Sequence, residues 1–263
     1  MPRELLHIYG PISINAYGTT IAVALLIFLW LIKQHPTRKS LFAHVDLTQA
    51  LIVGVLLGIA GGRTLYVLSN LNTIHGLMDI IDFWNGGFSV LGAVLAILFG
   101  LPLYLRAHEI PVLPFFDLIA IHAPLLQSIS RLGCFFAGCC YGRPTVLSWG
   151  VLYRGADTFA PYGVCLHPTQ IYSSLILLLI FCVMYFFAQY RLKKPGQLTA
   201  LYLLLISGER FLVDFWRDDQ EYLSSSALQQ LSINQWICLI IAISAGIGLW
   251  YFSSKPPTKS SNQ

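Results

Sequence analysis

The chain has 263 residues, of which 56% are apolar or aromatic and only 11% are charged, and its mean hydropathy is +0.67. Soluble domains carry about 25% charged residues, so this composition excludes an ordinary soluble enzyme and a disordered chain. The net charge of +4 is too small for a nucleic-acid-binding surface, which must neutralise many phosphates. The sequence therefore predicts an all-α polytopic membrane protein with no nucleic-acid partner.

Seven apolar stretches follow one another along the chain, and a membrane span needs about 20 such residues. They run over residues 13–32, 48–69, 86–105, 112–135, 168–189, 197–216 and 233–253. Charged and proline residues interrupt the fourth stretch, so six spans with a re-entrant fourth segment is the alternative. The first stretch lacks the basic leader and cleavage pattern of a secretory signal, and we expect it to remain as a helix. We predict a single transmembrane domain over residues 1–253 and a disordered tail over residues 254–263.

The basic residues between these stretches set the expected orientation, because positive charge marks the cytoplasmic side of a membrane. One set of connections, together with the tail, carries nine: Lys33, Arg38, Lys39, Arg106, Arg191, Lys193, Lys194, Lys255 and Lys259. The opposite set carries four: Arg3, Arg143, Arg154 and Arg217. The sequence thus predicts an N-terminus outside the cell and a C-terminus in the cytoplasm.

Three arginines lie inside the apolar stretches, where an ionised side chain is costly and by default indicates function. They are Arg63, Arg131 and Arg210. The expected orientation places all three in the outer half of the membrane. The groups that fall at the same depth are Tyr17, His167, Gly86 and Gly87. A guanidinium group binds phosphate through two parallel hydrogen bonds, so we expect this cluster to bind a phospholipid head group. Snorkelling of the arginines to the interface is the alternative.

The sixth stretch is the most highly charged of the seven. Arg210, Asp214 and Arg217 are spaced i, i+4 and i+7, which places them on one helix face, and Glu209 lies beside that face. We expect Asp214 to hold one arginine in place while another faces a ligand. An internal salt bridge at the membrane edge is the alternative.

The fourth stretch ends in a segment that is rich in glycine and cysteine. Its glycines, which can bring backbone N–H groups close to an anion, are Gly133, Gly138 and Gly142. Its cysteines are Cys134, Cys139 and Cys140, and their C-x4-C-C spacing indicates a metal site only weakly. A disulfide from Cys139 or Cys140 to Cys165 is a second interpretation, and thiol–disulfide chemistry by the three cysteines is a third.

Taken in order, these motifs resemble those of the bacterial prolipoprotein diacylglyceryl transferases, and the likeness covers most of the chain. The matching elements are Tyr17-Gly18, Gly61-Gly62-Arg63 with Tyr66, the segment 84–89, the signature from Arg131 to Gly142, His167-Pro168 with Gln170 and Tyr172, and Arg210 with Asp214. Several positions depart from the family pattern. Leu91 replaces a histidine, Ser130 a glycine, Cys134 and Ala137 two asparagines, and Cys139 and Asp214 two glutamates.

The resemblance implies transfer of a diacylglyceryl group from phosphatidylglycerol to the cysteine thiol of a prolipoprotein, with release of glycerol phosphate. It implies a bacterial inner-membrane enzyme whose site faces the outer leaflet and needs no cofactor or metal. Arg131 and Arg210 would stabilise charge on the phosphate, with Arg63 and Asp214 in support. His167 or Tyr17 would accept the proton of the thiol. The glycines that would let the backbone approach the head group are Gly86, Gly87, Gly133, Gly138 and Gly142.

Three other functions are compatible with part of the sequence. The first is a paralogous transferase that uses a phospholipid with a different acceptor or donor, and the same residues serve it. The second is a non-catalytic lipid-binding or transport protein, which predicts polar groups across the full depth of the membrane. The third is a thiol–disulfide protein, for which the chain lacks a C-x-x-C motif.

Overall fold

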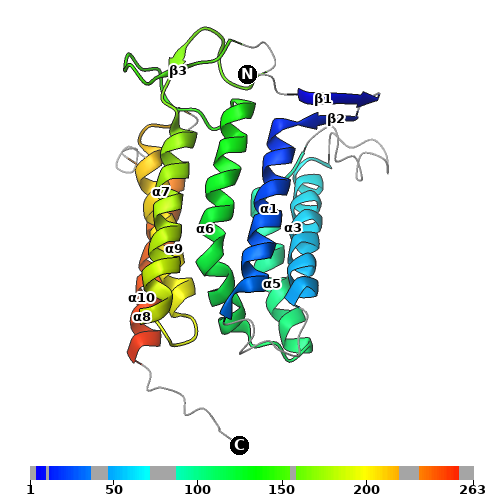
Figure 1. The fold of residues 1–263 in the computed structure, drawn as a ribbon, viewed down its shortest axis with the longest axis vertical. Helices are drawn as coiled ribbons and strands as arrows, with labels where there is room; N and C mark the ends of the chain where they lie inside the picture. The colour runs from blue at the N-terminus through cyan, green and yellow to red at the C-terminus, as the bar shows by residue number, and fades with distance from the viewer. Residues whose placement is uncertain are drawn as a thin grey trace, which may run out of the picture. The chain divides into compact units, whose positions relative to one another are not determined.

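The computed structural model describes residues 4–9, 12–36, 47–71, 87–154, 158–218 and 231–254. Within these residues the chain is mostly helical, and helices occupy all seven of the apolar stretches (Figure 1). In chain order they are α1 (Ala16–Gln34), α3 (Leu47–Ser69), α5 (Val90–Ala107), α6 (Val112–Ala137), α7 (Thr169–Val183), which continues through η2 (Met184–Ala188) and α8 (Gln189–Arg191), then α9 (Gln197–Asp214) and α10 (Ile233–Ser254).

Five helical segments are long and apolar enough to cross a membrane, which confirms a polytopic helical chain to that extent. They are Ala16–Gln34, Leu47–Ser69, Val112–Ala137, Thr169–Arg191 and Ile233–Ser254. The apolar part of α5 is shorter, and α9 contains three charged residues, Glu209, Arg210 and Asp214. The fourth stretch does not have the re-entrant form, because α6 is one continuous helix of 26 residues that passes through Pro124.

The prediction of a purely helical chain is wrong in one respect, because the structure contains two short antiparallel strand pairs. They are β1 (Glu4–Tyr9) with β2 (Ile12–Asn15), and β3 (Val151–Leu152) with β4 (Cys165–Leu166). Backbone groups outside the helices need hydrogen-bond partners, and here some of them pair with each other. Tyr153, Ala160 and Leu166 are buried together beside the second pair, so the long connection between α6 and α7 has a small core of its own.

Residues 35–115 form one compact unit, and residues 1–34 with 116–263 form another. In the first unit α3 packs closely along α5. A Cβ placed on Gly61 would lie 2.2 Å from the Cβ of Ala96 and 2.6 Å from the carbonyl oxygen of Gly92. Glycine is required at this contact because the two backbones nearly touch.

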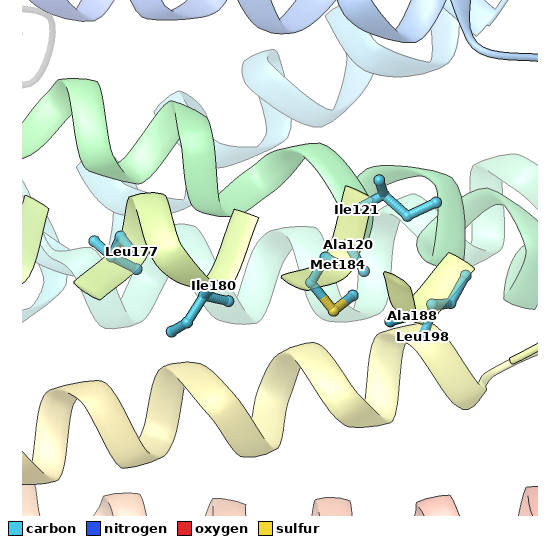
Figure 2. Packing of buried hydrophobic residues seen from close by; sticks show 7 residues of the cluster. All are labelled: Ala120, Ile121, Leu177, Ile180, Met184, Ala188 and Leu198. Atoms are coloured by element: carbon cyan, nitrogen blue, oxygen red, sulfur yellow. The ribbon is translucent and has the colours of Figure 1, made fainter. Parts of the chain in front are cut away.

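In the second unit α9 packs against α7 and α10 (Figure 1). Figure 2 shows the apolar cluster that α6, α7, η2 and α9 share, formed by Ala120, Ile121, Leu177, Ile180, Met184, Ala188 and Leu198. Met184 is fully buried in it. Lipid tails are as apolar as these side chains, so van der Waals packing, rather than burial from water, holds such helices together.

Hydrogen bonds fix α6 against its neighbours in the same unit. The buried carboxylate of Asp117 accepts from the backbone N–H of Gly196 (2.6 Å), the N–H of Thr199 (2.8 Å) and the hydroxyl of Thr199 (2.7 Å). These donors lie at the start of α9, where N–H groups lack helical partners and the helix dipole favours a negative charge. Ser128 and Ser174 each donate a hydroxyl to the other's carbonyl, at 2.8 and 3.0 Å, which joins α6 to α7.

Candidate active site

A cavity of about 330 Å³ lies between α6, α7 and α9. Its lining residues are Gln127, Ser130, Arg131 and Cys134 of α6, Leu177 of α7, and Ile206, Glu209 and Arg210 of α9. The four α6 positions are spaced i, i+3, i+4 and i+7, and the three α9 positions i, i+3 and i+4, so each helix presents one face. The structure thus brings Arg131 and Arg210, which lie 79 positions apart in the sequence, to the same cavity.

Arg210 is held by the ion pair that its spacing from Asp214 predicts. An Nη atom of Arg210 lies 3.4 Å from Asp214 Oδ1, and Arg217 Nε lies 4.0 Å from the same oxygen. The Asp214 side chain is 1% exposed, against 27% for Arg210, and it also accepts the hydroxyl of Ser232. A buried carboxylate shared by two arginines fixes the direction of the more exposed one, which faces the cavity.

Arg131 is placed differently from Arg210. Among the described residues, no carboxylate lies within ion-pair distance of its guanidinium group. The acidic residue of the lining is Glu209, which interacts electrostatically with both Arg131 and Arg210 and accepts the hydroxyl of Ser173. The cavity therefore carries two guanidinium groups and one buried carboxylate, and Arg131 keeps donors that a bound anion can use.

Glu209 is a cavity residue that the sequence did not place in the site. The sequence put it beside the charged face of the sixth stretch, because it precedes Arg210 by one position. Nothing in the sequence showed that the helix face carrying Ile206 and Glu209 lines the site. Gln127 and Ser130 were missed in the same way, because nothing in the sequence shows which face of α6 meets α9.

Tyr17 lies in the first turn of α1 and packs against the α6 signature. A Cβ on Gly133 would lie 3.3 Å from Tyr17 Cδ2 and 3.2 Å from Thr20 Cβ, so glycine allows α1 and α6 to pack closely there. The phenol is within electrostatic range of Arg131 and is 42% exposed. The structure therefore brings Tyr17 close to the arginine that the resemblance places at the phosphate.

The loop that follows α6 is fastened to the end of α9. Gly142 donates its backbone N–H to the carbonyl of His167 at 3.0 Å, and a Cβ on Gly142 would lie 2.6 Å from the carbonyl oxygen of Trp216. Gly138 starts the loop in the left-handed conformation, with φ +71°, and its N–H donates to a carbonyl of α6. These N–H groups thus have protein acceptors, and head-group binding by Gly133, Gly138 and Gly142 stays a prediction.

His167 is not among the residues that line the cavity. Its Nδ1 lies 3.2 Å from the hydroxyl of Tyr172, which also accepts the indole N–H of Trp149 at 2.8 Å. These three side chains form a polar chain where the loop enters α7. A role for His167 as the proton acceptor therefore stays a prediction.

Arg63 and Gly87 lie together in the unit of residues 35–115. The Arg63 guanidinium donates to the carbonyl of Gly87 at 2.7 Å and lies 5.3 Å from the ring centre of Tyr66. Gly87 has φ +85°, and a Cβ there would lie 2.4 Å from the Tyr66 ring. Arg63 and Tyr66 of one motif therefore pack against the glycine of the next, while Gly86 lies outside the described residues. Leu91, at the position of the family's histidine, is 63% exposed.

A family model described as prolipoprotein diacylglyceryl transferase matches residues 3–252. The chain belongs to the prolipoprotein diacylglyceryl transferase family. It is 32% identical over 253 residues to the phosphatidylglycerol–prolipoprotein diacylglyceryl transferase of Clostridium tetani, covering 96% of this chain and 97% of that protein. It is 32% identical to enzyme 2 of that name from Clostridium perfringens, over 90% of each chain, and 30% identical to the enzyme of that name from Methylibium petroleiphilum, over 94% of each.

Two cysteines that depart from the pattern of this family, Cys134 and Cys139, form a cluster with Cys140. The sulfur atoms of Cys134, Cys139 and Cys140 all lie within 4.8 Å of one another, and all six cysteines of the chain are free thiols in the structure. The predicted disulfide to Cys165 is therefore not present. Hydrogen bonds from the other two thiols lower the pKa of Cys140, and the charge of Arg217 lowers it further, against the opposing effect of burial.

Proposed function

We propose that the chain transfers a diacylglyceryl group from phosphatidylglycerol to the lipobox cysteine thiol of a prolipoprotein, forming a thioether and releasing glycerol phosphate. The observation that carries the proposal is the cavity in which α6 and α9 present Arg131 and Arg210, in a chain that belongs to this family. The names of its relatives give the same donor and acceptor.

The arginines account for the chemistry at the phosphate. The thiolate sulfur attacks the glyceryl carbon that carries the phosphate ester; a C–S bond forms, the C–O bond breaks, and the electron pair leaves on the phosphate oxygen. Negative charge grows on that oxygen, so fixed guanidinium donors lower the barrier. Arg131 contributes free donors, and Asp214 keeps Arg210 directed at the cavity.

The thiol must lose its proton, because the thiolate is the nucleophile. Tyr17 and His167 are the proposed acceptors. Tyr17 is supported by its packing on Gly133, two positions from Arg131 on α6. The carboxylate of Glu209 lines the cavity and is a third acceptor that the structure adds.

We further propose that the chain has seven spans, with the N-terminus outside the cell, the C-terminus in the cytoplasm, and the site facing the outer leaflet of a bacterial inner membrane. The distribution of nine and four basic residues between the two sides supports this orientation. Helices at all seven apolar stretches support the count. The orientation is tested by introducing a cysteine at either end of the chain and measuring its accessibility to a labelling reagent in intact cells.

The transfer is tested with purified protein in detergent, phosphatidylglycerol and a lipobox peptide, by reading the mass of the peptide. We expect a gain of one diacylglyceryl unit, which disappears when the peptide cysteine is replaced by serine. Arg131→Ala should lower the rate by a factor of at least about 10², whereas the exposed Arg154→Ala, away from the cavity, should retain it. Full transfer by folded Arg131→Ala would refute the assignment.

A paralogous transferase with another acceptor is favoured by one specific observation. Leu91, Cys134 and Cys139 replace polar residues of the family pattern, and Cys134 lines the cavity. If phosphatidylglycerol is consumed without a gain in peptide mass, the same lipid site serves a different acceptor, and the mass of the product identifies it.

A further inference from the structure

We propose that Cys134, Cys139 and Cys140 form a three-thiolate binding site for a soft d¹⁰ metal ion, Cu⁺ or Zn²⁺. The three sulfur atoms lie within 4.8 Å of one another. A metal–sulfur bond of about 2.3 Å requires sulfur atoms about 4 Å apart. Side-chain rotations that move each sulfur atom by less than about 1 Å therefore complete the site. Sulfur is the only donor type in the cluster, and thiolates select these soft ions over Mg²⁺ or Ca²⁺.

The backbone places the three thiols together because α6 ends between them. Cys134 lies in the last turn of α6, and the left-handed Gly138 turns the chain so that the N–H of Cys139 donates to the carbonyl of Cys134 at 3.1 Å. Cys140 is also left-handed, with φ 59°, which is uncommon for a residue with a side chain. Such a conformation persists only where the surroundings enforce it.

Two side chains in the first turn of α7 hold this backbone conformation. The hydroxyl of Thr169 donates to the carbonyl of Cys140, and the side-chain amide of Gln170 donates to the carbonyl of Cys139, both at 2.7 Å. Thr169 and Gln170 are each 1% exposed. These two hydrogen bonds hold the backbone of Cys139 and Cys140 in place before any ion binds, which is the role of supporting groups around a metal centre.

The electrostatic surroundings suit a cluster that becomes anionic. Three thiolates with Cu⁺ carry a net charge of −2, and with Zn²⁺ a net charge of −1. Arg131 and Arg217 lie within electrostatic range of Cys140 and offset this charge. Cys139 and Cys140 are only partly buried, so an ion can reach the site from outside the helices.

The test is metal binding by the full-length protein, purified in detergent and reduced. Zn²⁺ alone and Cu⁺ alone are each added, free ion is removed, and bound metal is measured by elemental mass spectrometry. We expect one ion per chain, and with Co²⁺ as a probe, a sulfur-to-cobalt charge-transfer absorption. The variant C134S/C139S/C140S should lose both signals. The matched control C165S/C182S/C238S, which removes the other three cysteines, should keep them.

A milder variant separates metal binding from folding. Thr169→Val keeps all three thiols and removes the bond to the Cys140 carbonyl, so we expect its metal affinity to fall by about tenfold or more. The proposal is overturned if the wild-type protein binds no more metal than the triple variant, or if the control loses the ion equally. It is also overturned if thiol titration finds two of the three cysteines joined as a disulfide in the protein as isolated.

Discussion

The ion pairs of Asp214 give the sharpest prediction about the proposed site. Asp214→Asn keeps the shape of the side chain and removes the charge that Arg210 and Arg217 share, at 3.4 and 4.0 Å. Removing one partner of a buried ion pair costs about 3–5 kcal/mol, because the other charge stays buried without compensation. Arg210 is 27% exposed and can turn toward solvent or lipid head groups, so we expect the lower end, about 3 kcal/mol.

The same change should also reduce catalysis. With Asp214 neutral, Arg210 is no longer directed at the cavity, and the loss of one fixed donor for a developing oxyanion lowers the rate by about 10²-fold. Unfolding followed by tryptophan fluorescence in detergent measures the first effect, and the peptide-mass assay measures the second. The matched control is Asp218→Asn, which neutralises an exposed carboxylate four residues further on.

Two results would refute this reasoning separately. If Asp214→Asn unfolds at the same free energy as Asp218→Asn, the ion pairs do not stabilise the protein. If Asp214→Asn is less stable but transfers at the wild-type rate below its unfolding temperature, Asp214 does not position Arg210 for the reaction.

Three further changes test other parts of the structure. Gly142→Ala places a Cβ 2.6 Å from a carbonyl oxygen and should lower stability by about 1–3 kcal/mol. Gly246→Ala, with open space around it, should not lower stability. Equal free energies of unfolding for these two variants would contradict the close packing at Gly142. Asp117→Asn turns an amide toward one of its backbone donors and should cost about 1–3 kcal/mol, and an unchanged unfolding free energy would contradict its role at the start of α9. Burial raises the pKa of Tyr153 to about 12, from about 10 in the unfolded chain. The protonated phenol therefore contributes stability below pH 10, and this contribution is lost as the pH rises toward 12. Tyr153→Phe should reduce that alkaline loss and the exposed Tyr162→Phe should not, as pH-dependent unfolding would show.

Local chemistry predicted the helices, because each backbone group of a span must find its partner within the span. An apolar run of about 20 residues therefore becomes a helix whatever its neighbours are. The pair Arg210 and Asp214 was predictable for the same reason, since i, i+4 spacing on one helix fixes the distance between the side chains. The β3–β4 pair was missed, because two-residue strands in a connection leave no periodic pattern.

Buried polar groups show how far such reasoning extends. Asp117 was an isolated polar residue in an apolar stretch, and the structure places it at the start of α9, 79 positions away along the chain. Glu209 and Arg131 line the same cavity although each belongs to a different helix. The faces that two helices turn toward each other depend on the packing of all their side chains, which the order of residues in either helix does not specify.

The sequence by itself determined the family, the helical stretches and the arginines expected at the phosphate, because a local pattern or an ordered set of motifs indicates each of them. Only the tertiary structure decided which of those residues share a cavity and that the weak C-x4-C-C spacing becomes a cluster of three sulfur atoms. The physical reason is the same in both cases. Side chains meet where a helix ends and turns, or where two helix faces pack, and both depend on contacts between segments far apart in the chain.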